Sequence, residues 1–181
     1  MGRSLWGRAF VIAVVASGIG CAPQEQAPAP TPTPEATPAS LSVSMSTELD
    51  AAPADVWKVV GDFGGLDSFV EAVESTDVEG EGVGAVRTLN LPEGAKVVET
   101  LEALDADAMS LSYRIDESPL PVEGYSSTMT VSELEGGRSK VEWSSTFKAK
   151  GAPDADAQKA ISDIYDMGFA GLKKLFPDKA E

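Results

Sequence analysis

The chain has 181 residues, a hydrophobic content of 43% and a formal net charge of -15, which predicts a globular domain with a strongly acidic surface. Such a surface repels phosphate backbones, so the composition argues against nucleic-acid binding. The sequence has no His and a single Cys, which excludes His-dependent catalytic triads, His-ligated metals and an internal disulfide. We expect neither a metal nor another cofactor.

The first 21 residues have the organisation of an export signal. Arg3 and Arg8 precede a short apolar run at 9–16, which is well below the roughly 20 residues of a spanning helix. Small residues then lead to Cys21, and this segment resembles a bacterial lipoprotein signal. The resemblance implies lipidation of Cys21 and an anchor in the cell envelope, on the periplasmic face of the outer membrane in a Gram-negative cell. A secreted or soluble periplasmic protein is the alternative.

Residues 22–40 are rich in Pro, Ala and Thr. Proline favours extended polyproline geometry and cannot donate a backbone hydrogen bond. At about 3.1 Å per residue, this stretch could span roughly 60 Å. We interpret it as a disordered tether that holds a domain at 41–177 away from a membrane.

The domain begins with a strand at 41–49, where apolar and polar residues alternate. Pro53 then opens a short helix that ends at Gly61, and a second short helical turn follows at 62–69. From there to residue 150 the pattern is a meander of strands separated by turns rich in Gly, Pro and Asp. These strands are predicted at 72–79, 85–91, 96–103, 109–115, 124–133 and 140–148. Their short connections predict antiparallel neighbours.

The last long segment, 154–176, reads as one amphipathic helix. Apolar residues recur at steps of three and four, including Ile161, Tyr165 and Leu172. Two glycines, Gly168 and Gly171, each cost about 1 kcal/mol relative to Ala inside a helix. We expect Gly171 to allow close packing against the sheet and Gly168 to leave space for a ligand.

Several segments, in this order, resemble the bacterial polyketide cyclase/dehydrase and lipid-transport family of the START/Bet v 1-like (SRPBCC) superfamily. They are residues 52–64, 82–89, 97–105, 111–115, 119–125, 141–147 and 171–175. The resemblance implies an α+β helix-grip fold. In this fold a curved antiparallel sheet, here of seven strands, wraps the C-terminal helix, two short helices follow the first strand, and a cavity for hydrophobic ligands lies between sheet and helix. The order of elements read from the residues agrees with it.

Arg87 and Glu99 are the first candidate site residues, because they fall on adjacent predicted strands and have apolar neighbours. If both point inward, they form a buried ion pair that could orient a polar ligand group or a carbonyl. A purely structural ion pair is the alternative.

The remaining candidates are side chains that could line the same space. Aromatic residues with a polar tip bring apolar area and hydrogen-bonding capacity together. The candidates of this kind are Tyr113, Tyr125, Trp143 and Tyr165. Further wall residues are Phe63, Phe69 and Met129, together with Gly168. An ordinary hydrophobic core is the alternative for all of them.

Three functions remain open from the sequence. The first is an envelope-tethered binding protein for a hydrophobic small molecule or lipid. The second is a cyclase or dehydratase-like enzyme in which Arg87, Glu99 and a tyrosine polarise carbonyls and move protons. The third is a periplasmic assembly or interaction factor, which would present an exposed apolar patch outside the cavity.

Overall fold

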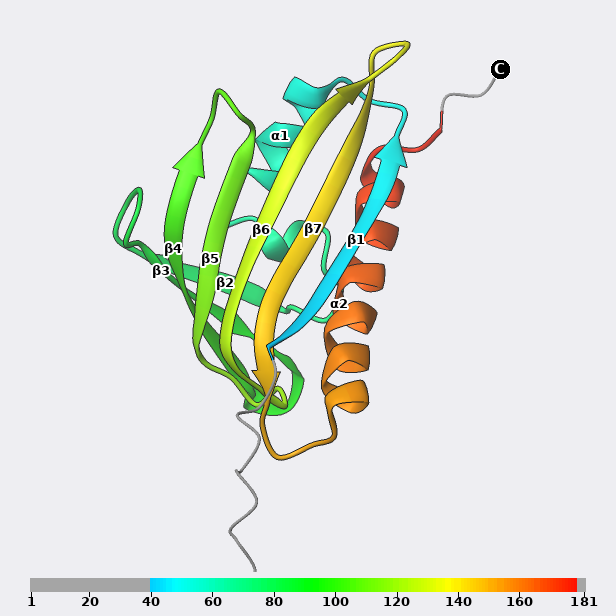
Figure 1. Cartoon of the computed structure of the whole chain (residues 1–181). Coiled ribbons are helices and arrows are strands. Elements are labelled where there is room, and N and C mark those ends of the chain that lie inside the picture. Colours follow the sequence, from blue (N-terminus) through cyan, green and yellow to red (C-terminus); the bar gives the residue numbers. More distant parts are fainter. Residues whose placement is uncertain (1–39, 179–181) are drawn as a thin grey trace, which may run out of the picture. The chain divides into compact units, whose positions relative to one another are not determined.

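The computed structural model describes residues 40–178, which form one antiparallel sheet of seven strands and a long helix on its concave side (Figure 1). The strands are β1 (Leu41–Leu49), β2 (Ser75–Glu79), β3 (Val86–Asn90), β4 (Lys96–Asp105), β5 (Ser110–Glu117), β6 (Val122–Leu134) and β7 (Arg138–Ala149). The helices are α1 (Pro53–Val60) and α2 (Asp154–Leu175), with single 3₁₀ turns at Leu66–Ser68 and Pro92–Gly94. The predicted helix-grip fold is confirmed.

The sheet order is β1-β7-β6-β5-β4-β3-β2, so each strand from β2 to β7 pairs with its neighbour in the chain. Strand β1 pairs with β7, so β1 and β2 are the two edge strands of the sheet. Register shifts interrupt the β4–β5 pairing after Val98 and Leu101, and the β6–β7 pairing after Glu123. Bulges of this kind bend a strand and increase its twist, which accounts for the curvature of the sheet.

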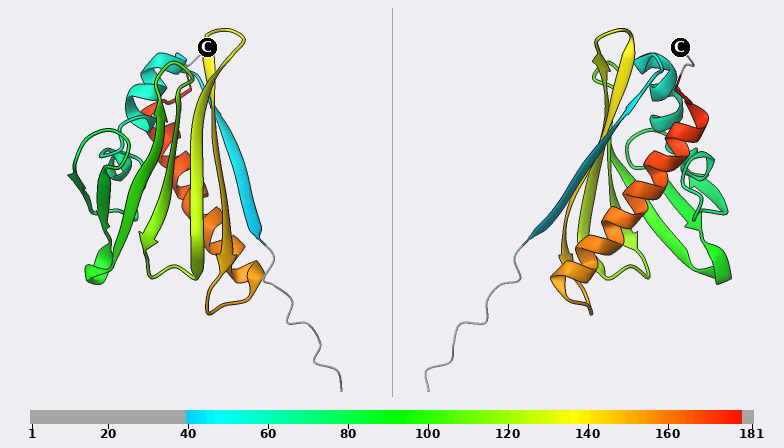
Figure 2. Two further views of the ribbon diagram at one scale, coloured as in Figure 1. Left: turned by 60° about the vertical axis from the view of Figure 1, so that its left-hand side comes forward. Right: turned by 90° about the vertical axis from the view of Figure 1, so that its right-hand side faces the viewer.

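Helix α2 runs obliquely across the concave face and lies against β1 and β7 (Figure 2). Its buried face consists of Ala157, Ile161, Tyr165, Gly168, Phe169 and Leu172. Acidic residues occupy its first turn and Lys173 and Lys174 its last, which complements the helix dipole. The apolar face predicted from Ile161, Tyr165 and Leu172 is therefore confirmed, whereas Leu175 at the end of the helix is 46% exposed.

Two predicted elements are shorter than expected. The strand predicted at 72–79 begins only at Ser75, because residues 70–73 form turns that direct Val70 and Val73 into the core. The second helical segment is a single 3₁₀ turn, Leu66–Ser68, which buries Leu66. Together these short pieces close one end of the space between the sheet and α2.

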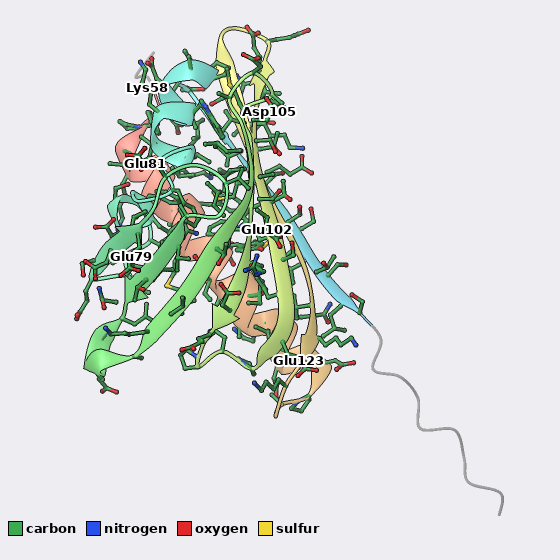
Figure 3. All side chains as sticks on the ribbon, turned by 90° about the vertical axis from the view of Figure 1, so that its left-hand side faces the viewer. Lys58, Glu79, Glu81, Glu102, Asp105 and Glu123 are labelled. Atoms are coloured by element: carbon green, nitrogen blue, oxygen red, sulfur yellow. The ribbon has the colours of Figure 1, made fainter. Side chains whose placement is uncertain are left out.

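Most acidic residues of the described part face outward, as the net charge predicts, whereas Glu99 is buried. Figure 3 shows Glu79, Glu81, Glu102, Asp105 and Glu123 projecting from the sheet and its loops, and all five are exposed. Within residues 40–178, no helix is long and apolar enough to cross a membrane. The predicted signal, the lipidation of Cys21 and the tether lie outside the described residues and stay predictions.

Candidate ligand-binding cavity

A cavity of about 200 Å³ lies between the sheet and α2. Its inner walls come from several elements: Leu66 and Val70 near the 3₁₀ turn, Leu89 on β3, Val97 on β4 and Ile161 on α2. These side chains are buried, and the wall is almost entirely apolar. For comparison, a dry apolar cavity of about 150 Å³ suffices to bind benzene. The space therefore suits a compact hydrophobic molecule.

The cavity opens to solvent on one side, where its lining residues are only half-buried. These rim residues are Ala72, Leu91, Ile115, Leu120 and Ile164. They come from the turn before β2, the residue after β3, strand β5, the β5–β6 loop and α2. An apolar rim of this kind offers a hydrophobic ligand a path into the interior without crossing charged side chains.

Arg87 and Glu99 face each other as cross-strand partners on β3 and β4. The Nε of Arg87 donates a hydrogen bond to Oε2 of Glu99 at 2.5 Å, and both side chains are about 95% buried or more. The Nη1 of Arg87 donates to the backbone oxygen of Phe63 at 3.0 Å. The guanidinium also lies between the rings of Phe63 and Tyr113, 4.3 and 4.6 Å from their centroids. The predicted inward-facing ion pair therefore forms.

The two members of this pair differ in their access to the cavity. Glu99 is among the lining residues, whereas Arg87 is not. Burial raises the pKa of Glu99 above its usual value, and the charge and hydrogen bond of Arg87 act in the opposite direction. The guanidinium is held by Glu99, Phe63 and Tyr113, so the polar group that a ligand would meet here is the carboxyl group of Glu99.

A buried cluster of aromatic side chains lines part of the cavity and is joined by one serine. The rings of Trp143 and Tyr165 stack with centroids 4.2 Å apart and planes 16° apart. The hydroxyl groups of Tyr125 and Tyr165 are 2.8 Å apart, and Ser127 Oγ lies 3.3 Å from the Tyr165 hydroxyl. The indole Nε1 of Trp143 donates to both Tyr113 and Ser127, at 3.0 Å each. This network fixes three phenol groups in the wall of the cavity.

Burial also determines the protonation of these phenols. Loss of hydration raises the pKa of Tyr113, Tyr125 and Tyr165 above the usual value of 10. For Tyr113, the nearby negative charge of Glu99 adds to this effect. All three groups therefore stay neutral at physiological pH and can act as hydrogen-bond donors.

The structure brings five of the predicted site residues to the cavity wall: Glu99, Tyr113, Tyr125, Trp143 and Tyr165. Four others are buried beside it without lining it: Phe63, Phe69, Arg87 and Met129. Arg87 and Phe63 support the wall from behind, through the contacts with Glu99 and Tyr113 described above. Whether any of these residues contacts a ligand stays a prediction.

The interpretation of the two glycines needs correction. A Cβ atom at Gly168 would lie 2.7 Å from Cζ3 of Trp143, so the space expected there for a ligand is filled by the indole ring. A Cβ atom at Gly171 would lie 1.8 Å from the backbone oxygen of Phe69, so the close approach is to the segment after the 3₁₀ turn and not to the sheet. Both glycines therefore serve packing.

Sequence reasoning did not assign most of the apolar wall to the site. The spacing predicts an inward position for Ile161, but periodicity cannot separate a core position from a cavity position. No pattern in the sequence predicts that Leu120 lies at the cavity, because a loop residue between two prolines has no periodic neighbours. Its place at the rim follows from the path of the β5–β6 loop.

A curved sheet gripping a long helix around an apolar cavity defines a helix-grip fold of the kind that binds hydrophobic ligands. The family described as "Polyketide cyclase / dehydrase and lipid transport" matches residues 40–177. The chain belongs to this family. The resemblance found in the sequence is thereby confirmed at the level of the superfamily.

Solved structures support the same assignment. The protein XoxI from Bacillus cereus is 31% identical, with a TM-score of 0.71 over 76% of this chain and 96% of that one. An uncharacterized protein from Bacillus thuringiensis is also 31% identical, with a TM-score of 0.72 over 76% of this chain and 100% of that one. A protein from Nitrosospira multiformis, 23% identical with a TM-score of 0.66 over 76% and 97%, shares the fold. Comparison with curated proteins gives no match.

Proposed function

We propose that the protein is an envelope-tethered binding protein for a compact hydrophobic molecule, which it holds between the sheet and α2. The observation that carries this proposal is the apolar cavity of about 200 Å³ with its apolar rim. Membership of a family that includes lipid-transport proteins supports the same function. Ligand sites in proteins are typically apolar and carry a few convergent polar groups, which matches Glu99 and the three phenols.

The volume sets the size of the ligand. It lies below the range of about 300–1,000 Å³ that is typical of pockets for drug-sized molecules. A molecule of one or two rings, or part of a longer chain that emerges at the rim, fits this space. The rim residues Leu91, Leu120 and Ile164 would contact the emerging part.

The envelope location rests on the first 40 residues. The signal-like segment ending at Cys21 and the proline-rich stretch after it support a lipid anchor with a tether. Labelling with an azide analogue of palmitate, followed by membrane fractionation, tests this part. Wild-type protein is expected to carry label and to sediment with membranes, and Cys21→Ala to lose both. Equal labelling of the two would refute the anchor.

Catalysis by the Arg87–Glu99 pair is less well supported than binding. That hypothesis requires Arg87 to meet a substrate carbonyl, and Arg87 does not line the cavity. Its guanidinium is instead directed to Glu99, the Phe63 carbonyl and two aromatic rings. The contacts of this ion pair are therefore those of a structural pair, in which only the Glu99 side chain is accessible from the cavity.

Native mass spectrometry of the full-length protein, with extraction of the released ligand, tests the binding function. Ile164→Trp adds bulk at the rim, and Val83→Trp places the same ring on a loop residue that is 63% exposed. We expect the wild type and Val83→Trp to retain a small-molecule adduct and Ile164→Trp to lose most of it. Equal retention by both variants, or no adduct in any of the three proteins, would contradict the proposal.

A further inference from the structure

The buried hydroxyl network has a direction, which follows from counting its hydrogens. Ser127 has one hydroxyl hydrogen and donates it to the backbone oxygen of Ser144, at 2.9 Å. In the contact between Ser127 and Tyr165, at 3.3 Å, Tyr165 must therefore be the donor. The hydrogen of Tyr165 is then in use, so Tyr125 donates in the 2.8 Å contact between the two tyrosines. The chain runs from Tyr125 through Tyr165 and Ser127 to the Ser144 carbonyl.

The indole group of Trp143 completes this network as a shared donor. Its N–H points to the oxygen atoms of both Tyr113 and Ser127, at 3.0 Å each. Ser127 thereby accepts from Trp143 and from Tyr165, which uses both of its lone pairs. Ser127 has no capacity left to accept a further hydrogen bond.

Tyr113 is the member of the network whose own hydrogen is not used. Its oxygen accepts from Trp143, but no acceptor for its hydroxyl hydrogen occurs among the hydrogen bonds of residues 40–178. The side chain is 2% exposed and lines the cavity. Of its charged neighbours, Arg87 can only donate. The Glu99 carboxylate can accept more than the bond from Arg87, but no hydrogen bond joins it to Tyr113 within residues 40–178. A buried donor without an acceptor is unfavourable, so a group entering the cavity gains by accepting from it.

We propose that the Tyr113 hydroxyl is a ligand-binding donor and that the natural ligand is an apolar molecule with a neutral acceptor oxygen, such as the carbonyl of a ketone or ester. This inference rests on the proposed binding function and makes its ligand more specific. The other two phenols do not fill this role, because the hydrogens of Tyr125 and Tyr165 are used within the network. Tyr113 remains a donor throughout the physiological pH range.

A pair of small aromatic probes separates this hydrogen bond from hydrophobic burial. Acetophenone and ethylbenzene have nearly the same shape and differ by a carbonyl in place of a methylene group. Their dissociation constants are measured with the full-length protein by NMR titration, following the indole N–H signal of Trp143. The quantity of interest is the selectivity, defined as the dissociation constant of ethylbenzene divided by that of acetophenone.

Tyr113→Phe is the informative variant, because it removes one oxygen and leaves the ring in place. The network then loses the donor that has no partner and one of the two acceptors of the Trp143 indole, which keeps its hydrogen bond to Ser127. Tyr125→Phe is the matched control, since it removes a phenol oxygen from the same cavity wall but a hydrogen that is already in use. An unchanged affinity of Tyr113→Phe for ethylbenzene verifies that its cavity is intact.

We expect Tyr113→Phe to lower the selectivity for acetophenone by about three- to tenfold, the range of a net hydrogen bond between neutral groups. Tyr125→Phe is expected to leave the selectivity within about twofold, whatever its effect on the two affinities. If wild type binds both probes and Tyr113→Phe has the same selectivity, the binding function stands and the role of Tyr113 is refuted. If neither probe binds wild type, the cavity is not a ligand site and both proposals fail.

Discussion

Gly171 is the position where the packing of α2 is least able to accept a side chain. It lies inside the helix, beside the backbone that follows the 3₁₀ turn. A Cβ atom there would lie 1.8 Å from the carbonyl oxygen of Phe69, 2.6 Å from its carbonyl carbon and 2.9 Å from its Cα. The substitution Gly171→Ala therefore forces α2 away from this segment, which closes one end of the cavity.

Two opposing effects determine the magnitude. Alanine gains about 1 kcal/mol over glycine in helix propensity. Overpacking a tight contact costs typically about 1–3 kcal/mol and occasionally more. Since all three close atoms belong to the backbone, no rotamer change can relieve the clash, and the upper end of this range applies. We expect Gly171→Ala to lower the free energy of unfolding by about 2 kcal/mol.

Gly168→Ala is the matched control, because it has the same gain in helix propensity. Its Cβ atom would lie 2.7 Å from Cζ3 of Trp143, with the next contacts at 3.5 and 3.6 Å. The close contact is with one side chain and not with the backbone, so the overpacking cost is expected at the low end of about 1–3 kcal/mol and is largely offset by the gain in propensity. We expect a net change of about 1 kcal/mol or less.

Urea unfolding followed by tryptophan fluorescence gives both free energies by linear extrapolation. The reasoning predicts that Gly171→Ala is less stable than Gly168→Ala by at least about 1 kcal/mol. If Gly171→Ala were as stable as Gly168→Ala or as the wild type, then the contact between α2 and Phe69 would not restrict the fold.

Three further predictions concern buried charge and backbone strain. Arg87→Met leaves the carboxylate of Glu99 buried without its cation, so thermal unfolding is expected to show a free energy of unfolding lower by about 3 kcal/mol. The double substitution with Glu99→Leu is expected to recover most of this loss, and no recovery would contradict the account of the ion pair. The pKa of Glu99 is raised in the folded state, so the carboxyl group ionises at lower pH in the unfolded chain, whose usual value is 4.5. In urea titrations, the free energy of unfolding of the wild type is therefore expected to fall relative to that of Glu99→Gln as the pH rises. A loss of wild-type stability relative to Glu99→Gln as the pH falls would refute this prediction. Glu93 has a φ of 62°, so Glu93→Gly is expected to raise the melting temperature by relieving about 1 kcal/mol of strain, whereas a lower melting temperature would show that its side chain stabilises the turn.

The order of elements and the inward faces could be predicted from the sequence, because both are recorded in local spacing. The alternation of Leu111 and Tyr113 on β5, and of Val141 and Trp143 on β7, identifies buried positions directly. The contact between Arg87 and Glu99 could also be predicted, because a short turn between adjacent strands limits the possible registers.

The difference between lining the cavity and supporting its wall could not be predicted. Arg87 and Glu99 have the same pattern of apolar neighbours, but only Glu99 lines the cavity. The space next to Gly168 likewise depends on the size and rotamer of Trp143, which lies on another element. Such features arise from three-dimensional packing between elements that are distant in sequence.

The central claim is that the space between the sheet and α2 receives a hydrophobic ligand, and intermolecular NOEs from bound ethylbenzene test it most directly. The account predicts NOEs to the methyl groups of Val97 and Ile161, which line the cavity, and none to those of Val83 and Leu104, which are 63% and 42% exposed. NOEs confined to the two exposed residues, or saturating binding without any NOE to Val97 or Ile161, would contradict it.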